Sequence, residues 1–284
     1  MADNLSTDDT TGATTVSLDG VPETMLWPLW NRAFEAQRSD RLIDDPWSID
    51  LVRSIDYDFE ASFGRPSSGH GIRARFGDDL VRDFLGRWSG KAMVVALGEG
   101  LETQYWRLGE PDVPWLSVDL PGSIDVRQRL LPKAGSMSFR PVSALDDAWM
   151  DDIPEDRVPF ISAMGLLMYF TEAEVVGLLT RIAARFAQAE VFFDAIPTWF
   201  SNKTMDGFQL TKHYRAPPMP WGISHDDVPA FIRSIPRLEP VQVLTYADPY
   251  PSRMRFFRLL GKISAIRRRF APSLVHVRVD PPSP

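Results

Sequence analysis

The chain has 284 residues, of which 44% are hydrophobic and 24% are charged, values typical of a globular protein with a full hydrophobic core. Its formal net charge of −7 argues against a nucleic-acid binder that works by neutralising phosphates. The absence of cysteine excludes disulfides, thiolate zinc sites, iron–sulfur clusters and cysteine nucleophiles.

The first residues are acidic and polar, and residues 1–16 are predicted to form a disordered leader rather than a signal peptide. The C-terminal DPPSP is expected to be equally loose. No apolar run approaches the ~20 residues that a membrane helix needs. These features predict a soluble cytoplasmic protein with no membrane or nucleic-acid partner.

The spacing of apolar residues predicts helices from Val21 to about Leu85. One segment, DDPWSIDLVRSI, begins with Asp and Pro residues that favour a helix start. Another, HGIRARFGDDLVRDFLGRW, has charges on one side and apolar residues on the other, namely Ile72, Phe76, Leu80, Val81 and Phe84. We therefore predict a helical cap over residues 17–90.

The pattern changes between residues 93 and 196, where five short apolar runs alternate with segments that can form helices. The runs are MVVAL, WLSVDL, MSFRPV, PFISAM and EVFFDAI. Two later runs, VQVLTYA and LVHVRV, flank a last helix around Arg253 to Phe270. Such alternation predicts an α/β fold over residues 91–284, with a doubly wound, mostly parallel seven-stranded sheet whose end strand is antiparallel. Residues 17–284 would then form one domain.

The clearest helix is TEAEVVGLLTRIAARFAQA. Thr171 and Glu174 have the spacing of a capping box at its start. Its predicted buried stripe consists of Val175, Leu178, Leu179, Ile182 and Phe186.

Two glycines follow the first apolar run, in MVVALGEGLETQYWRL. Glycine lets a ligand approach the backbone, and open α/β sheets bind ligands at the carboxyl ends of their strands. Asp119 ends the next run 119 − 98 = 21 residues after Gly98, which matches the offset of ~20 for an acid that binds ribose. Packing glycines and a turn-forming Asp119 are the alternative. Thr103 replaces the third glycine of a dinucleotide motif, which weakens a nicotinamide-dependent oxidoreductase as the interpretation.

Longer motifs run through the chain from the first helices to the region after the sheet. In order they are RAFEAQRSDRLIDDPWSIDLVRSIDYDF, GIRARFGDDLVRDFL, VVALGEGLETQYWRL, WLSVDLPGSIDVRQRLLP, MGLLMYFTEAEVVGLL and YRAPPMPWGI. Together they resemble the leucine carboxyl methyltransferase and TcmP-like family of class I S-adenosylmethionine (SAM) enzymes. The resemblance favours the TcmP-like polyketide branch. It implies a Rossmann-like fold, SAM as the cofactor, and methyl transfer to a carboxylate or hydroxyl of a small hydrophobic molecule.

The resemblance also implies a SAM site. Arg73 matches the arginine that grips the methionine carboxylate, and Arg75 would take that role if the register shifted by two residues. The backbone at Gly98 and Gly100 is implied to line the methionine, and Asp119 to hold the ribose hydroxyls. The residues implied to edge the adenine are Ser143, Ala144 and Leu145.

Four positions depart from the family pattern. Met164 stands where the family has a glutamate beside the methionine ammonium, so a negative charge is missing there. Glu99 between the two glycines would offer a nearby carboxylate in its place. Gln104 replaces an arginine, and Glu102 replaces an aspartate conservatively. These departures leave open a family member that binds SAM without transferring a methyl group.

A carboxylate acceptor needs no general base, because it is already ionised at neutral pH, whereas a phenol would benefit from one. Of the four histidines, only His213 falls where a lid would cover the pocket. Tyr169 follows the fourth strand, so Tyr169 and His213 are the candidate catalytic residues. His70 is assigned to a Gly/Ser-rich loop, and His225 and His276 to structural or surface positions. No pair has metal-ligand spacing on one element, and no metal site is predicted.

Residues 197–223 are predicted to form the lid. Its aromatic and methionine side chains would line a pocket for a flat hydrophobic acid; alternatively, they only cover the edge of the sheet. They are Trp199, Phe200, Phe208, Tyr214, Met219 and Trp221.

Seven basic residues lie from Arg253 to Arg269. We predict the solvated face of a packed helix there, with docking of an acidic carrier protein as the alternative. Packing is inferred from Phe256, Phe257, Leu259 and Leu260.

Overall fold

A seven-stranded sheet forms the centre of the protein, and the computed structural model describes residues 21–281. The strands are β1 (Ala92–Leu97), β2 (Trp115–Asp119), β3 (Met137–Pro141), β4 (Val158–Ala163), β5 (Glu190–Ala195), β6 (Leu238–Thr245) and β7 (Ser273–Val279). Their order is β3-β2-β1-β4-β5-β7-β6. The first five are mutually parallel, and β7 is antiparallel to both β5 and β6. The predicted α/β class is confirmed, although the antiparallel strand lies inside the sheet and not at its end.

Eleven α-helices are described within residues 21–281. They are α1 (Leu26–Ala36), α2 (Pro46–Ser54), α3 (Phe59–Phe63), α4 (Gly69–Arg87), α5 (Gln104–Arg107), α6 (Pro121–Leu130), α7 (Glu172–Arg185), α8 (Thr198–Met205), α9 (Val228–Arg233), α10 (Arg255–Gly261) and α11 (Ser264–Phe270). Short 3₁₀ helices are η1 (Val21–Met25), η2 (Asp147–Asp152), η3 (Leu167–Tyr169) and η4 (His225–Asp227). The leader predicted for residues 1–16 and most of the predicted loose tail lie outside the described residues.

Local chemistry sets the start of two predicted helices. Asp45 caps α2 by accepting a hydrogen bond from the amide of Ser48 at 3.0 Å, and Pro46 is the first helical residue. The capping box of α7 is present, since Thr171 and Glu174 exchange side-chain and backbone hydrogen bonds. The apolar stripe predicted for α7 is buried throughout.

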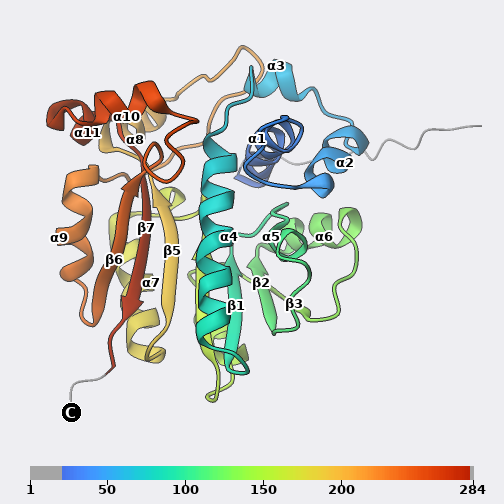
Figure 1. The fold of residues 1–284 in the computed structure, drawn as a ribbon, viewed down its shortest axis with the longest axis vertical. Helices are drawn as coiled ribbons and strands as arrows, with labels where there is room; N and C mark the ends of the chain where they lie inside the picture. Colours follow the sequence, from blue (N-terminus) through green and yellow to red (C-terminus); the bar gives the residue numbers. More distant parts are fainter. Residues whose placement is uncertain (1–20, 282–284) are drawn as a thin grey trace, which may run out of the picture.

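Two hydrophobic cores lie on the two faces of the sheet. In β1, Val94 belongs to the core that contains Phe76 and Val81 of α4. Its neighbour Val95 points to the other face and joins the core that contains Leu178 of α7. Helix α4 accordingly runs along one face while α7 covers the other (Figure 1). This doubly wound arrangement leaves the carboxyl ends of the parallel strands free to hold a ligand.

Helices from both ends of the chain gather over those carboxyl ends. In Figure 1, α1, α2 and α3 lie above one part of the sheet, and α8, α10 and α11 lie above the other. Helix α4 packs on α1 and also on β1 and β4, so it connects the N-terminal helices to the sheet. The boundaries predicted for a cap (17–90), a core (91–284) and a lid (197–223) stay predictions.

Two charged side chains of α4, Arg73 and Asp78, are buried against charged partners from other elements. The prediction of a packed helix in the basic segment was wrong. The apolar residues of the basic segment are not packed, since Phe256, Phe257 and Leu259 are 67%, 60% and 61% exposed. The segment forms two short helices, α10 and α11, neither of which has a buried residue.

Candidate functional site

A cavity of about 860 Å³ lies at the carboxyl ends of β1, β2, β4 and β5, and its size is within the usual range for small-molecule sites. Side chains from η1, α1 and α4 line one side, and side chains from α8, α10 and α11 line another. The cavity therefore lies between the sheet and the helices that gather above it.

The turn after β1 brings backbone directly to the cavity. Gly98 and Gly100 both have positive φ, at 61° and 49°, a conformation that side-chain-bearing residues rarely adopt. A Cβ atom on Gly98 would lie 2.7 Å from a methyl carbon of Leu166, and one on Gly100 would lie 3.0 Å from the Cβ of Met25. Only glycine fits both positions without a shift of the surrounding atoms.

Asp119 is joined to this turn. Its Oδ2 accepts a hydrogen bond from the amide of Gly100 at 2.8 Å, and its Oδ1 accepts one from the amide of Leu120 at 2.7 Å. Burial raises the pKa of the Asp119 carboxyl, against the opposing effect of these two amides. A carboxylate has about four acceptor sites, so Asp119 keeps lone pairs for a ligand in the cavity that it lines.

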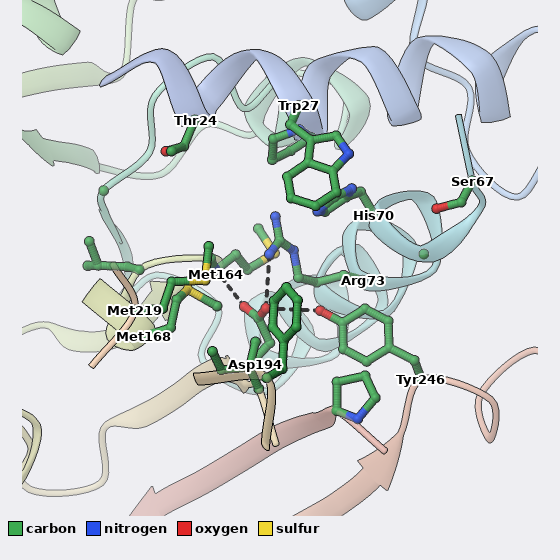
Figure 2. A pocket seen from close by; sticks show the side chains of 18 of the residues that line it. Thr24, Trp27, Ser67, His70, Arg73, Met164, Met168, Asp194, Met219 and Tyr246 are labelled. Atoms are coloured by element: carbon green, nitrogen blue, oxygen red, sulfur yellow. Dashed lines mark hydrogen bonds and ion pairs between the residues drawn. The ribbon is translucent and has the colours of Figure 1, made fainter. Parts of the chain in front are cut away.

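A buried ion pair lies at the centre of the site. Arg73 Nη1 is 3.0 Å from Oδ2 of Asp194, at the end of β5, and both side chains are almost fully buried. Asp194 also accepts hydrogen bonds from the hydroxyl of Tyr246 at 2.9 Å and from the amide of Gly165 at 2.5 Å. Figure 2 shows Arg73 and Tyr246 converging on Asp194. Burial opposes the charge of Arg73, but the attraction of Asp194 outweighs it and raises the pKa of the guanidinium.

The walls around this pair are largely apolar. Met164, Met168 and Met219 lie beside Asp194, and Trp27 lies on the far side of Arg73 from Asp194 (Figure 2). Met164 lines the cavity at the position where the family motif has glutamate, so the structure has a thioether there. Asp194, which the sequence analysis did not single out, is the carboxylate that accompanies Arg73.

Glu99 does not replace the negative charge that is missing at Met164. Its Oε1 lies 2.9 Å from Arg127 and accepts a hydrogen bond from the indole of Trp115 at 3.2 Å. Burial raises the pKa of the Glu99 carboxyl, with Arg127 acting against that rise. The side chain is therefore committed to a neighbouring ion pair, although it also borders the cavity.

Glu102 and Gln104, the other two departures from the family pattern, belong to a buried charge network. Arg107 Nη2 lies 2.9 Å from Asp78, and its Nη1 contacts Asp45 and Glu102. Burial acts against ionisation of Glu102, but Arg107 and Arg32 outweigh it and lower the pKa of the carboxyl to about 2. This network joins α2, α4 and the turn after β1.

Gln104 occupies the position of the family arginine within that network. Its amide donates to Asp78 at 3.1 Å, beside the guanidinium of Arg107. Arg107 comes three residues later in the chain and supplies a positive charge to the same carboxylate. The substitution therefore leaves Asp78 with a cationic partner.

The structure brings together only part of the predicted site. Arg73, Gly98, Gly100 and Asp119 all line the cavity. Arg75 does not line the cavity, because it pairs with Asp79 on the outer side of α4. Of the two candidate arginines, only Arg73 lines the cavity. The residues assigned to the adenine lie in the loop after β3, are not among the lining residues, and keep that role only as a prediction; they are Ser143, Ala144 and Leu145.

The two candidate catalytic residues have different surroundings. Tyr169 lines the cavity, and burial raises the pKa of its hydroxyl, with a hydrogen bond to Thr24 acting against that rise. His213 is exposed and does not line the cavity, because its loop turns back through hydrogen bonds to Thr211. The prediction that His213 reaches a substrate as a base therefore disagrees with its position.

Some side chains of the predicted lid line the cavity, and others pack against the protein. Trp199, Phe200 and Met219 line the cavity. Tyr214 instead packs edge-on against Phe63, and the others pack against protein as well: Phe208 against Phe200, and Trp221 against Phe193 and Phe231. Only the first group is available to a ligand.

Two site residues were missed by the sequence analysis. Asp194 ends a predicted strand, and an acid at the carboxyl end of a parallel strand is a usable signal. His70 was assigned to a loop, but it lies in the first turn of α4 and lines the cavity. Its spacing of three residues from Arg73 on a predicted helix would have placed the two side chains near one another.

Among residues 21–281 no group of three histidine or acidic side chains is arranged to hold a metal ion. The helices of the same range include none with both the length and the apolar content needed to cross a bilayer. The prediction that no metal binds stays a prediction.

The chain is similar to several known proteins. A model of the family described as leucine carboxyl methyltransferase matches residues 26–183. The tetracenomycin polyketide synthesis O-methyltransferase TcmP of Streptomyces glaucescens is 31% identical over 197 residues, which cover 65% of this chain and 69% of that protein. The S-adenosyl-L-methionine-dependent methyltransferase dpfgK of Gibberella zeae is 31% identical over 202 residues, which cover 63% and 67%. The solved magnesium protoporphyrin IX methyltransferase (ChlM) of Synechocystis PCC 6803 with bound SAM aligns with a TM-score of 0.46 at 10% identity, covering 94% of this chain and 100% of that chain.

Proposed function

We propose a function from the premise that this chain belongs to the leucine carboxyl methyltransferase family. The chain is a SAM-dependent O-methyltransferase. Its acceptor, in our proposal, is a carboxylate or hydroxyl oxygen of a small hydrophobic molecule of the polyketide type. The observation that carries the proposal is the cavity that joins the glycine turn, Asp119 and the Arg73–Asp194 pair.

The donor set fits SAM. Arg73 and Asp194 together offer a cation and an anion, which suits a zwitterionic amino acid group. Asp119 has free lone pairs for ribose hydroxyls, and the cradle at Gly98 and Gly100 has no Cβ atoms in the way. When bound, SAM would supply a methyl group on a sulfonium for in-line attack by an oxygen nucleophile.

The remaining lining supports a hydrophobic acceptor. The side chains of Trp27, Met168, Trp199 and Phe200 border the cavity and would exclude water around a flat ring system. Like any tyrosine, Tyr169 is protonated near neutral pH, and burial raises its pKa further, so it can donate a hydrogen bond but is a poor base. A carboxylate acceptor needs no base, which makes it the preferred acceptor in this proposal.

Calorimetric titration with SAM and with its demethylated product, S-adenosylhomocysteine, tests the cofactor. Binding of both is expected, with enthalpy changes measurable for folded protein. A folded preparation that binds neither ligand contradicts the proposal. Incubation with methyl-labelled SAM and a panel of aromatic acids and phenols then tests transfer.

A second function is favoured by one observation, the thioether of Met164 at the position of the family glutamate. In this alternative the protein binds SAM without transferring its methyl group. It predicts normal binding in the titration but no labelled product from any acceptor. A Met164→Glu variant that gains transfer activity would support this alternative over the first.

A further inference from the structure

The imidazole of His70 is a polar group of the cavity to which no role has yet been assigned. It lies in the first turn of α4, three residues before Arg73, and it lines the same cavity. The indole of Trp27 packs edge-on against it, with ring centroids 5.7 Å apart and an interplanar angle of 69°. Figure 2 shows His70 beside Trp27, on the α4 side of the cavity that also carries Arg73. The ring is therefore held in place at the edge of the ligand space.

A chain of two hydrogen bonds fixes where the His70 proton is. The backbone amide of Ser67 can only donate, and it lies 2.7 Å from Oδ1 of Asn31, so this atom is the amide oxygen. The other side-chain atom of Asn31, Nδ2, is then a donor, and it lies 2.6 Å from Nδ1 of His70. Nδ1 must therefore carry a lone pair. A neutral imidazole in this position has its proton on Nε2.

The surroundings keep the ring neutral. Burial and the positive charges of Arg73 and Arg32 lower the pKa of His70 well below its usual value, with Glu102 acting weakly in the opposite sense. Protonation at Nδ1 would also place two donors face to face at Asn31. Both effects leave Nε2–H as the group that a cavity ligand meets, and no acceptor for it is found among the described residues.

We propose that Nε2–H of His70 and the guanidinium of Arg73 form a carboxylate-binding subsite in which His70 acts only as a hydrogen-bond donor. A ligand atom that meets Nε2–H must be an acceptor, and the nearby guanidinium favours an anionic one. Histidine used in this way cannot be a general base, because its only free nitrogen already holds the proton. The inference rests on the proposed function for the identity of its ligands. The carboxylate belongs either to the methionine part of SAM or to the methyl acceptor.

The proton position is tested first, without any ligand. The protein is labelled with ¹⁵N-histidine. The chain has only four histidines, so the signals that disappear in a His70→Phe variant are those of His70. The expected spectrum has an unprotonated Nδ1 and a protonated Nε2 from pH 8 to pH 6. A protonated Nδ1, or a ring that becomes charged in this range, would overturn the proposal even if SAM binds normally.

The source of the carboxylate is tested by titration of two variants. His70→Phe keeps a ring of similar shape without a donor, and His70→Gln restores an N–H group. If the subsite holds the methionine carboxylate, His70→Phe weakens S-adenosylhomocysteine binding about tenfold but leaves 5′-methylthioadenosine, which lacks that carboxylate, unchanged. If it holds the acceptor, the variant weakens 2-naphthoate binding to protein saturated with S-adenosylhomocysteine about tenfold, and 2-naphthamide binding much less.

His70→Gln is expected to recover most of the lost affinity in whichever titration is affected. Thermal unfolding of both variants verifies that they fold. Carboxylate affinities that stay within twofold of wild type in both titrations would overturn the subsite. A wild-type protein that binds no SAM analogue at all would instead contradict the proposed function, while the ¹⁵N result would still decide the role of the ring.

Discussion

At the scale of single residues, the site depends on buried charges that have partners within the protein. Asp194 accepts from three donors, Arg73 among them, and Asp119 accepts from two backbone amides. Such pairing offsets the free energy of desolvation, which is several kcal/mol for an isolated buried ion. The charges can therefore stay in fixed positions before a ligand arrives, which reduces the free energy of ordering the site when it binds.

Asp119→Asn tests the ribose contact. The amide oxygen can still accept from one of the two backbone amides that Asp119 binds, but the NH2 group then faces the other, so a modest fall in the unfolding temperature is expected. Loss of the negative charge should weaken S-adenosylhomocysteine binding about tenfold, because hydrogen bonds to charged groups are stronger than neutral ones. Titration calorimetry measures this change. Asp112→Asn, at an exposed turn, is the control that should leave affinity unchanged; an equal affinity for both variants would exclude Asp119 from the binding site.

At the scale of elements, helix caps and a buried network decide how the helices meet the sheet. The capping box starts α7 at Thr171, and the network around Arg107 fixes α2 and α4 to the turn after β1. The first stabilises one helix locally, whereas the second holds the helices above the sheet at a defined distance from the glycine turn. We expect their removal to have different consequences.

Thr171→Ala removes the cap of α7. The expected loss in the free energy of unfolding is about 1 kcal/mol, because the amide of Glu174 loses its acceptor. Urea denaturation measures it. Thr180→Ala is the matched control, since Thr180 is exposed within the same helix and alanine has the higher helix propensity. A loss of stability in the control equal to that of Thr171→Ala would show that the cap contributes nothing of its own.

Asp78→Ala breaks the buried network. It leaves the guanidinium of Arg107 short of one buried counter-ion, and the free energy of unfolding is expected to fall by about 3 kcal/mol. Asp125→Ala removes the partner of Arg129 in an exposed pair on α6 and should cost less than about 0.5 kcal/mol. Chemical denaturation of both variants gives the comparison. A small loss for Asp78→Ala would mean that water or the other acids compensate the freed charge.

At the scale of the whole molecule, a second ionic cluster lies at the end of the sheet away from the cavity. Glu190 of β5 is buried and contacts Arg87 of α4 at 2.7 Å and His276 of β7 at 2.8 Å. It therefore joins a helix to two strands far from the cavity. This separation of a stabilising cluster from the ligand site allows the two to be perturbed independently.

Stability should depend on pH through Glu190. Burial opposes its ionisation, but hydrogen bonds from His276 and Arg87 outweigh burial and lower the pKa of the carboxyl to about 2. A folded-state pKa below the unfolded one gives stability that is fully present above about pH 4.3 and is lost as pH falls towards 2. Urea denaturation at several pH values should show this loss. Glu190→Gln should be less stable at pH 7 and should lose less stability over that acidic interval; an unchanged pH profile would contradict the assignment.

Much of the architecture was predictable because β1, β2, β4 and β5, which are parallel and buried, are continuous apolar runs. All seven predicted runs are strands, and the capping box of α7 marks its first turn. The basic segment was mispredicted, because its phenylalanines and leucines suggest burial in any helix long enough to have a buried face. The chain instead breaks into α10 and α11, a local event that apolar content does not encode.

The sequence by itself determined the fold class, the glycine turn and the acid at the end of β2, since each depends on residues close together in the chain. The tertiary structure alone decided that Asp194 accompanies Arg73 across 121 residues of sequence, that His213 lies outside the cavity, and that His70 lines it within reach of Asn31. Such pairings depend on which strand ends and helix faces meet in space. Sequence spacing does not record that relation, because burial and hydrogen-bond partners are set only when the sheet and the helices above it pack together.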